Sequence, residues 1–199
     1  MSRATIVAIV EGQGEEAAVP VLLRRMAAEI APDLWLDVPR PIRVSRGALL
    51  TQGGPERYVE TAAVSGGPGA GVLVLLDADD DCPADLGPRL LTRVEKARSD
   101  RPGSVVLANK EFEAWFLAAA PSLSGCRGLA KDLVSPDDAE ARRDCKGWLS
   151  ACRTDGRSYK PAADQAALAQ VFDMGLARER SPSFDKLWRD VTRLLTAER

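Results

Sequence analysis

Short apolar runs alternate along the chain with longer segments that have helical periodicity. The apolar runs predict strands at residues 5–10, 72–76 and 104–109. The periodic segments predict helices at residues 15–30, 55–64, 83–99 and 181–198. This alternation is typical of βαβ units, so the pattern predicts an α/β, Rossmann-like fold with a mostly parallel sheet flanked by helices.

The strand at residues 72–76 reads VLVLL without polar alternation, which predicts a central strand covered on both faces. Residues 36–46 are expected to be extended, with two prolines limiting the first half to an edge or irregular stretch. Residues 47–54 are expected to form a loop, and residues 65–71 a flexible connector. We expect one domain over residues 1–199, with a core of about 1–120 and a polar, helical C-terminal extension of about 121–199.

The composition narrows the chemistry available to this chain of 199 residues. It has no histidine and four cysteines without a CxxC pair, which argues against zinc and removes every Ser–His or Cys–His nucleophile. A hydrolase of this composition would depend on carboxylates and hard cations. The net charge of −2 favours no nucleic-acid partner globally, so any such contact must be local.

The N-terminal apolar run is short and is interpreted as a first strand rather than as part of a signal peptide. No segment approaches the roughly 18 apolar residues that a membrane span needs. We therefore expect a cytoplasmic protein with no membrane partner.

Acidic motifs follow three of the predicted strands: VEGQGEE at residues 10–16, LDADDD at 76–81 and KEFE at 110–113. Because parallel strands of an open α/β sheet end at one edge, where ligands bind, these acids should converge there. Converging carboxylates repel one another unless a cation lies among them, and Mg²⁺ or Mn²⁺ prefers such oxygen ligands. The candidate metal ligands are Glu11, Glu15, Asp77, Asp79, Asp81, Glu111 and Glu113.

Other interpretations of these motifs remain open to different degrees. Each motif alone could be a capped turn or a solvated acidic loop. The series Gly12, Gly14 and Ala17 fits a loose dinucleotide-binding fingerprint, but the glutamates around it would repel a pyrophosphate. A calcium EF-hand starting at Asp77 is excluded, because its sixth position is Cys82 rather than glycine.

A glutamate and glycine after the first strand, followed by Asp-x-Asp after a later strand, resembles the TOPRIM signature. Topoisomerases, primases and the overcoming-lysogenisation-defect nucleases share this signature. A longer resemblance, to a family of small stand-alone TOPRIM-like proteins, lies in VEGQGEE, LLDADDD, KEFEAWFLA, YKPAADQAALAQVFD and SPSF and covers nearly the whole chain.

The resemblance implies roles for individual residues. Glu11 would be the catalytic or metal-linked glutamate, and Asp77 and Asp79 would be catalytic as the core ligands of Mg²⁺ or Mn²⁺. Lys160 would be catalytic through contact with a phosphate or the transition state. Glu15 would be an additional acid of nuclease-type members, and a second metal site would draw on Asp81, Glu111 and Glu113.

The leading hypothesis is a Mg²⁺- or Mn²⁺-dependent nuclease or phosphotransfer enzyme acting on nucleic acid, and the resemblance implies a role in defence against foreign DNA. The alternative is a non-catalytic, metal-binding regulatory or effector module that acts with a separate ATPase, because the chain has no P-loop. The exposed side of the last helix could serve a partner or a homodimer. Local phosphate contacts are predicted at Arg43, Arg46, Arg57, Lys110, Lys146 and Lys160. A Glu11 placed away from the 77–81 segment, or a lysine or arginine filling the space between them, would end the metal-site hypothesis.

Overall fold

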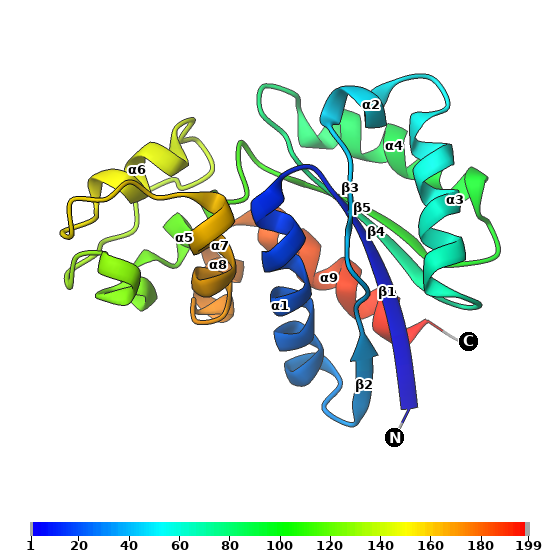
Figure 1. Ribbon diagram of the computed structural model, residues 1–199, viewed down its shortest axis with the longest axis horizontal. Helices are drawn as coiled ribbons and strands as arrows, with labels where there is room; N and C mark the ends of the chain where they lie inside the picture. The colour runs from blue at the N-terminus through cyan, green and yellow to red at the C-terminus, as the bar shows by residue number, and fades with distance from the viewer. Residues whose placement is uncertain (1, 198–199) are drawn as a thin grey trace.

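The protein forms a parallel sheet that is flanked by helices (Figure 1). The structure, a computed structural model, describes residues 2–197. The sheet order is β2-β1-β4-β5, with β3 pairing with β1, and every pairing is parallel. The predicted α/β fold with a mostly parallel sheet is therefore confirmed. The strands are β1 (Ser2–Val10), β2 (Leu34–Asp37), β3 (Ile42–Arg43), β4 (Gly71–Asp77) and β5 (Gly103–Ala108).

Helices cover both faces of this sheet. On one face lie α1 (Gln13–Ile30) and α9 (Pro182–Thr196), and on the other lie α3 (Gly54–Gly66) and α4 (Pro83–Ala97). Because side chains alternate along a strand, successive residues of β1 and β4 enter two separate hydrophobic clusters. In β4 the cluster under α1 and α9 receives Leu73, and the cluster under α3 and α4 receives Val74. The expected coverage of this strand on both faces is confirmed.

A second group of helices lies beside the sheet, at the left of Figure 1. It contains α5 (Ala114–Ala118), α6 (Cys145–Ala151), α7 (Pro161–Ala169) and α8 (Met174–Arg180). Aromatic rings join this group to α9, with ring centroids 5.3 Å apart for Trp115 and Phe184 and 5.5 Å apart for Phe172 and Phe184. The C-terminal segment thus shares the core of the sheet domain.

Two local expectations were wrong. The predicted loop at residues 47–54 contains a short helix, α2 (Arg46–Leu50), because the Ser45 hydroxyl caps it by accepting a hydrogen bond from the Ala48 amide at 3.4 Å. The segment before α6 is not a polar helix. It holds only the 3₁₀ turns Ala120–Leu123 and Cys126–Gly128 and then runs irregularly. The predicted end of the last helix, residue 198, lies outside the described residues.

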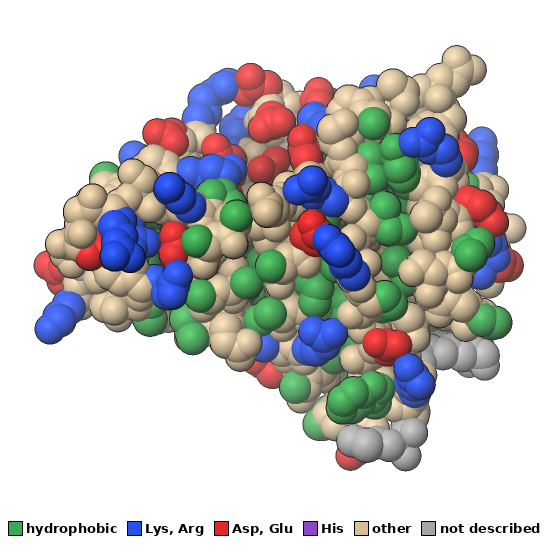
Figure 2. All heavy atoms as spheres, in the orientation of Figure 1, with side chains coloured by type: hydrophobic (Ala, Val, Ile, Leu, Met, Phe, Trp, Pro, Cys, Tyr) green, Lys and Arg blue, Asp and Glu red, His purple; other side chains and the backbone are tan. Residues whose placement is uncertain are grey.

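None of the helices in the described part of the chain combines the length and the apolar character that a membrane crossing requires. Over the face drawn in Figure 2, acidic and basic side chains are interspersed, which agrees with the nearly balanced charge of the chain.

Candidate functional site

The carboxyl ends of β1 and β4 lie side by side, and the predicted acids follow them. Val10 of β1 pairs with Leu75 of β4, so Glu11 and Asp77 emerge at nearly the same level of the sheet. Glu15 is in the first turn of α1. These three acids line one cavity of about 360 Å³, together with Lys146 and the first residues of α7. The structure therefore brings Glu11, Glu15 and Asp77 together, as the sequence predicts.

Glu11 contributes a carboxylate oxygen that is not satisfied within the described residues. Its Oε2 atom is buried and has no hydrogen-bond partner there. Burial raises the pKa of Glu11, and the neighbouring charges of Asp79 and Glu15 raise it further, whereas Arg46 lowers it. Glu15 itself accepts a hydrogen bond from the Gly12 amide, which ties its carboxylate to the turn between β1 and α1.

The backbone of the segment that follows β5 orients Asp77. Its Oδ1 atom accepts a hydrogen bond of 2.7 Å from the Phe112 amide, while its Oδ2 atom lies 3.8 Å from the Lys146 ammonium. Burial raises the pKa of Asp77 well above its usual value, and Glu15 adds to the shift, whereas Lys146 opposes it. This carboxyl therefore holds a proton more readily than an exposed aspartate does.

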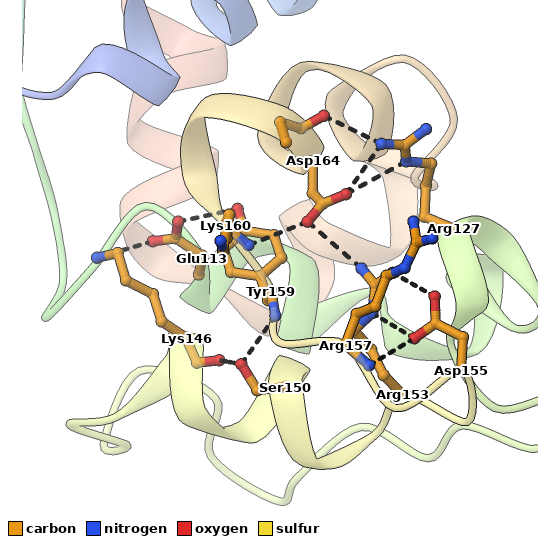
Figure 3. A network of polar contacts seen from close by, with 11 residues as sticks. Glu113, Arg127, Lys146, Ser150, Arg153, Asp155, Arg157, Tyr159, Lys160 and Asp164 are labelled. Atoms are coloured by element: carbon orange, nitrogen blue, oxygen red, sulfur yellow. Dashed lines mark hydrogen bonds and ion pairs between the residues drawn. The ribbon is translucent and has the colours of Figure 1, made fainter.

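Glu113 is fully buried, and its charge acts on Asp77. Figure 3 shows Glu113 with its partners Tyr159 and Lys146. The Oε1 atom of Glu113 accepts hydrogen bonds from the Tyr159 hydroxyl at 2.9 Å and the Gln165 amide at 3.2 Å, and its Oε2 atom lies 3.2 Å from the Lys146 ammonium. Burial raises the pKa of Glu113, with Lys146 acting against it. Burial also raises the pKa of Tyr159, and the Glu113 charge adds to this shift. Tyr159 therefore remains a neutral phenol, and its hydroxyl proton forms the hydrogen bond to Glu113.

Lys146 supplies the positive charge at the centre of the acids. Besides Asp77 and Glu113, its ammonium contacts Glu111 at 3.2 Å. Burial lowers the pKa of Lys146, but the three carboxylates outweigh burial and raise it. The side chain is still 38% exposed, because it reaches the cluster from the first turn of α6, outside the sheet.

Arg46 occupies the other side of the strand end. Its guanidinium donates hydrogen bonds to the carbonyl groups of Asp77 and Ala78, forms an ion pair with Asp81 and lies 3.9 Å from Asp79. Arg46 and Lys146 were predicted as phosphate contacts, but here they pair with the acids, because the converging carboxylates attract the nearest cations. Among the described residues, no three acidic side chains are grouped closely enough to hold a metal ion.

Lys160 does not face this cavity. It precedes α7 and lines a different pocket, with Arg127, Arg153 and Arg157, on the other side of the first turn of that helix. The sequence analysis missed these arginines and also the buried partners of Glu113. No local pattern marks them, since their positions depend on how α7 packs against α1 and the 126–128 turn.

Comparison with known protein families gives a match that spans both of these sites. A family model described as "Domain of unknown function (DUF4276)" matches residues 10–192. The chain belongs to this family. No curated protein and no solved structure gives a significant match. The DUF4276 description names no activity, so the resemblance to TOPRIM proteins stays a prediction.

The residues of this DUF4276 chain fit a hard dication in part. The donors at the cavity are carboxylate oxygens, which suit Mg²⁺ or Mn²⁺, and the buried Glu11 oxygen lacks a partner among the described residues. Against this, Arg46 interacts both with Glu11 and with Asp79 and Asp81, and Lys146 contacts Asp77, which is the kind of arrangement that counts against the metal site. The two cations already balance much of the negative charge. A dication at Asp77 would therefore have to displace the ammonium of Lys146.

Proposed function

We propose that the acids at the ends of β1, β4 and β5 form the active site of a Mg²⁺- or Mn²⁺-dependent phosphodiesterase that cleaves nucleic acid. These acids, which we call the strand-end cluster, are Glu11, Glu15, Asp77 and Glu113. The observation that carries this proposal is the unpartnered Glu11 oxygen, which lines the same cavity as Asp77 and Glu15. A buried polar atom left without a partner costs about 1–3 kcal/mol, and more if it is charged. A cation bound at the cavity would recover that free energy.

Glu11 and Asp77, with Asp79 beside Glu11, would hold the ion. A bound dication would activate a water molecule and offset the negative charge of the phosphate. Groups of the protein around the ion would orient its carboxylate ligands. The Phe112 amide holds the Asp77 carboxylate in place, and the buried Glu113 holds the ammonium of Lys146 beside it.

The ion pair between Lys146 and Asp77 does not preclude this role. At 3.8 Å it is the longest of the three contacts that Lys146 makes, and the partly exposed side chain has a flexible stem. A doubly charged ion competes favourably for a carboxylate with a single ammonium. Lys146 would then turn toward the phosphate of the substrate. We also propose that the protein acts in the cytoplasm and that its substrates include foreign DNA.

A specific observation favours a second function. Because Arg46 and Lys146 pair with the acids, the cluster is electrostatically balanced without a metal ion. Such a cluster suits a non-catalytic module that acts with a separate ATPase. In that case the metal would bind without any hydrolysis, or the acids would serve only to hold α6 and α2 against the sheet.

Cleavage assays on the purified protein distinguish these functions. Supercoiled DNA, linear DNA and RNA are incubated with Mg²⁺ or Mn²⁺ and with wild type, Glu11→Gln or Asp77→Asn protein. We expect metal-dependent cleavage that both variants lose and that Asp185→Asn, a partly exposed acid of α9 outside the cavity, retains. Calorimetric metal binding without cleavage would support the module instead. Absence of both metal binding and cleavage would refute the proposed activity.

A further inference from the structure

A second cavity, of about 560 Å³, lies on the other side of the first turn of α7. Figure 3 shows the residues on both sides of the Tyr159–Lys160 segment. Glu113 and Lys146 lie on one side, and Arg127 and Arg153 lie on the other. Four basic and two acidic side chains line this second cavity, so its lining carries a net charge of +2. The whole chain has a net charge of −2. The cavity is defined by Arg127, Arg153, Asp155, Arg157, Lys160 and Asp164, and we call it the arginine pocket.

A buried carboxylate fixes two of the arginines. Asp164, whose side chain is 6% exposed, accepts hydrogen bonds from Arg127 at 3.0 Å and from Arg153 at 3.3 Å. It also accepts one from the Lys160 amide at 3.0 Å. Arg127 and Arg153 come from segments far apart in the sequence, so Asp164 is the group that holds their guanidinium planes at one wall of the pocket.

The second acid of the pocket is already engaged. Asp155 forms a two-point contact with Arg153, with distances of 2.9 and 2.6 Å. The hydrogen bonds from Arg153 lower the pKa of Asp155 to about 2, so this carboxylate remains ionised and paired. It neutralises Arg153, while Asp164 pairs with Arg127, so the two acids of the pocket are taken up by these two arginines.

Arg157 and Lys160 are the remaining cations of the pocket. Both are exposed, and within residues 2–197 neither the Arg157 guanidinium nor the Lys160 ammonium makes a hydrogen bond or a close ion pair. Gly156 has a φ of +73°, a left-handed turn that favours glycine and that sets the course of the chain into Arg157. Two fixed guanidinium groups and two unpaired cations thus face one cavity, an arrangement that attracts an anion.

We propose that the arginine pocket binds a phosphate group of a nucleic-acid strand. Guanidinium groups match phosphate oxygens with paired hydrogen bonds, and lysine adds a mobile point charge. No aromatic side chain of the described residues lines the pocket, so it offers no stacking platform and recognises the phosphate rather than a base. That the phosphate belongs to nucleic acid rests on the proposed function. One turn of α7 separates the pocket from the strand-end cavity, so an anchored strand would extend toward Asp77.

Binding measured in EDTA tests this site separately from catalysis. Fluorescence anisotropy compares a labelled oligonucleotide carrying a 5′-phosphate with the same oligonucleotide lacking it, and inorganic phosphate and pyrophosphate serve as competitors. The double variant Arg157→Gln, Lys160→Gln should bind about tenfold more weakly or worse, since it loses two charge-assisted contacts. The slope of log Kd against log salt concentration should fall by about one, as expected when one phosphate contact is lost. Both substitutions spare the buried Asp164 pairs, so circular dichroism and the Tm should match wild type.

The matched control is Arg89→Gln, Lys96→Gln, which removes an exposed arginine and an exposed lysine of α4. We expect its Kd to stay within about twofold of wild type, because these side chains lie far from the phosphate. Equal weakening in both double variants, or none in either, would overturn the site. Binding of pyrophosphate without binding of oligonucleotide would overturn the nucleic-acid assignment. A protein that binds oligonucleotide through the pocket but never cleaves it would sustain this inference and refute the proposed activity.

Discussion

Replacing Lys146 with methionine tests the electrostatics of the strand-end cluster most directly. The substitution keeps a flexible side chain of similar length and removes the ammonium that lies 3.2 Å from Glu113 and 3.8 Å from Asp77. Glu113 has a fully buried side chain, so its charge would lose its cationic partner. We therefore expect a less stable protein at neutral and alkaline pH.

The size of the effect follows from the burial of the two partners. Removing one partner of a fully buried pair costs about 3–5 kcal/mol. Lys146 is 38% exposed, so solvent screens part of its interaction, and we expect a loss of about 2 kcal/mol in the free energy of unfolding. The matched control is Lys186→Met, which removes a 39% exposed lysine paired with Asp190 on α9 and should cost about 0.5 kcal/mol.

The loss should depend on pH in a defined direction. Burial already raises the pKa values of Glu113 and Asp77, and Lys146 lowers them, so its removal raises them further. A carboxyl whose folded pKa is raised contributes stability that is present below its unfolded pKa and lost as pH rises through the folded pKa. The deficit of the variant should therefore be small near about pH 4, close to the unfolded pKa values, and larger near about pH 8, because it grows as pH rises through the folded pKa values.

Urea unfolding followed by circular dichroism at both pH values, with and without millimolar Mg²⁺, measures these quantities. If the metal site is real, Mg²⁺ should stabilise the Lys146→Met variant more than wild type, because its competitor for Asp77 is gone. A deficit of the same size at both pH values, or no larger than that of Lys186→Met, would refute the electrostatic reasoning.

Three further predictions concern the packing around the site. Gly14→Ala should destabilise the fold by about 1–3 kcal/mol in urea unfolding, because the new Cβ would lie 2.7 Å from the Cβ of the proline that begins α7. Gly47→Ala, where nothing lies within 4 Å, should be neutral or slightly stabilising. Glu140→Ala should lower the free energy of unfolding by about 3 kcal/mol, since this buried carboxylate accepts hydrogen bonds from two serines and an asparagine near the start of α9. A thiol reagent should label the exposed Cys82 in the native protein and leave Cys145 unlabelled until unfolding, because burial raises the pKa of Cys145 to about 12. Rapid native labelling of Cys145 would contradict this structure.

The local pattern of the sequence was sufficient to predict the parallel sheet and the acids at its edge. VLVLL lacks polar alternation because both faces of β4 are covered, so a property of the fold is visible within five residues. Glu11 and Asp77 follow their strands directly, and parallel strands end at one edge whatever the details of packing. The shared cavity of Glu11, Glu15 and Asp77 could therefore be predicted.

The tertiary structure alone decided which cations meet these acids. Lys146 and Arg46 come from α6 and α2, short helices whose positions depend on contacts far along the chain. The same long-range packing buries Glu113 and turns Lys160 toward the arginine pocket instead of Asp77. A sequence pattern records which residues follow a strand, because that relation is local. The balance between a metal ion and an ammonium at a carboxylate depends on distances that only the packed chain sets.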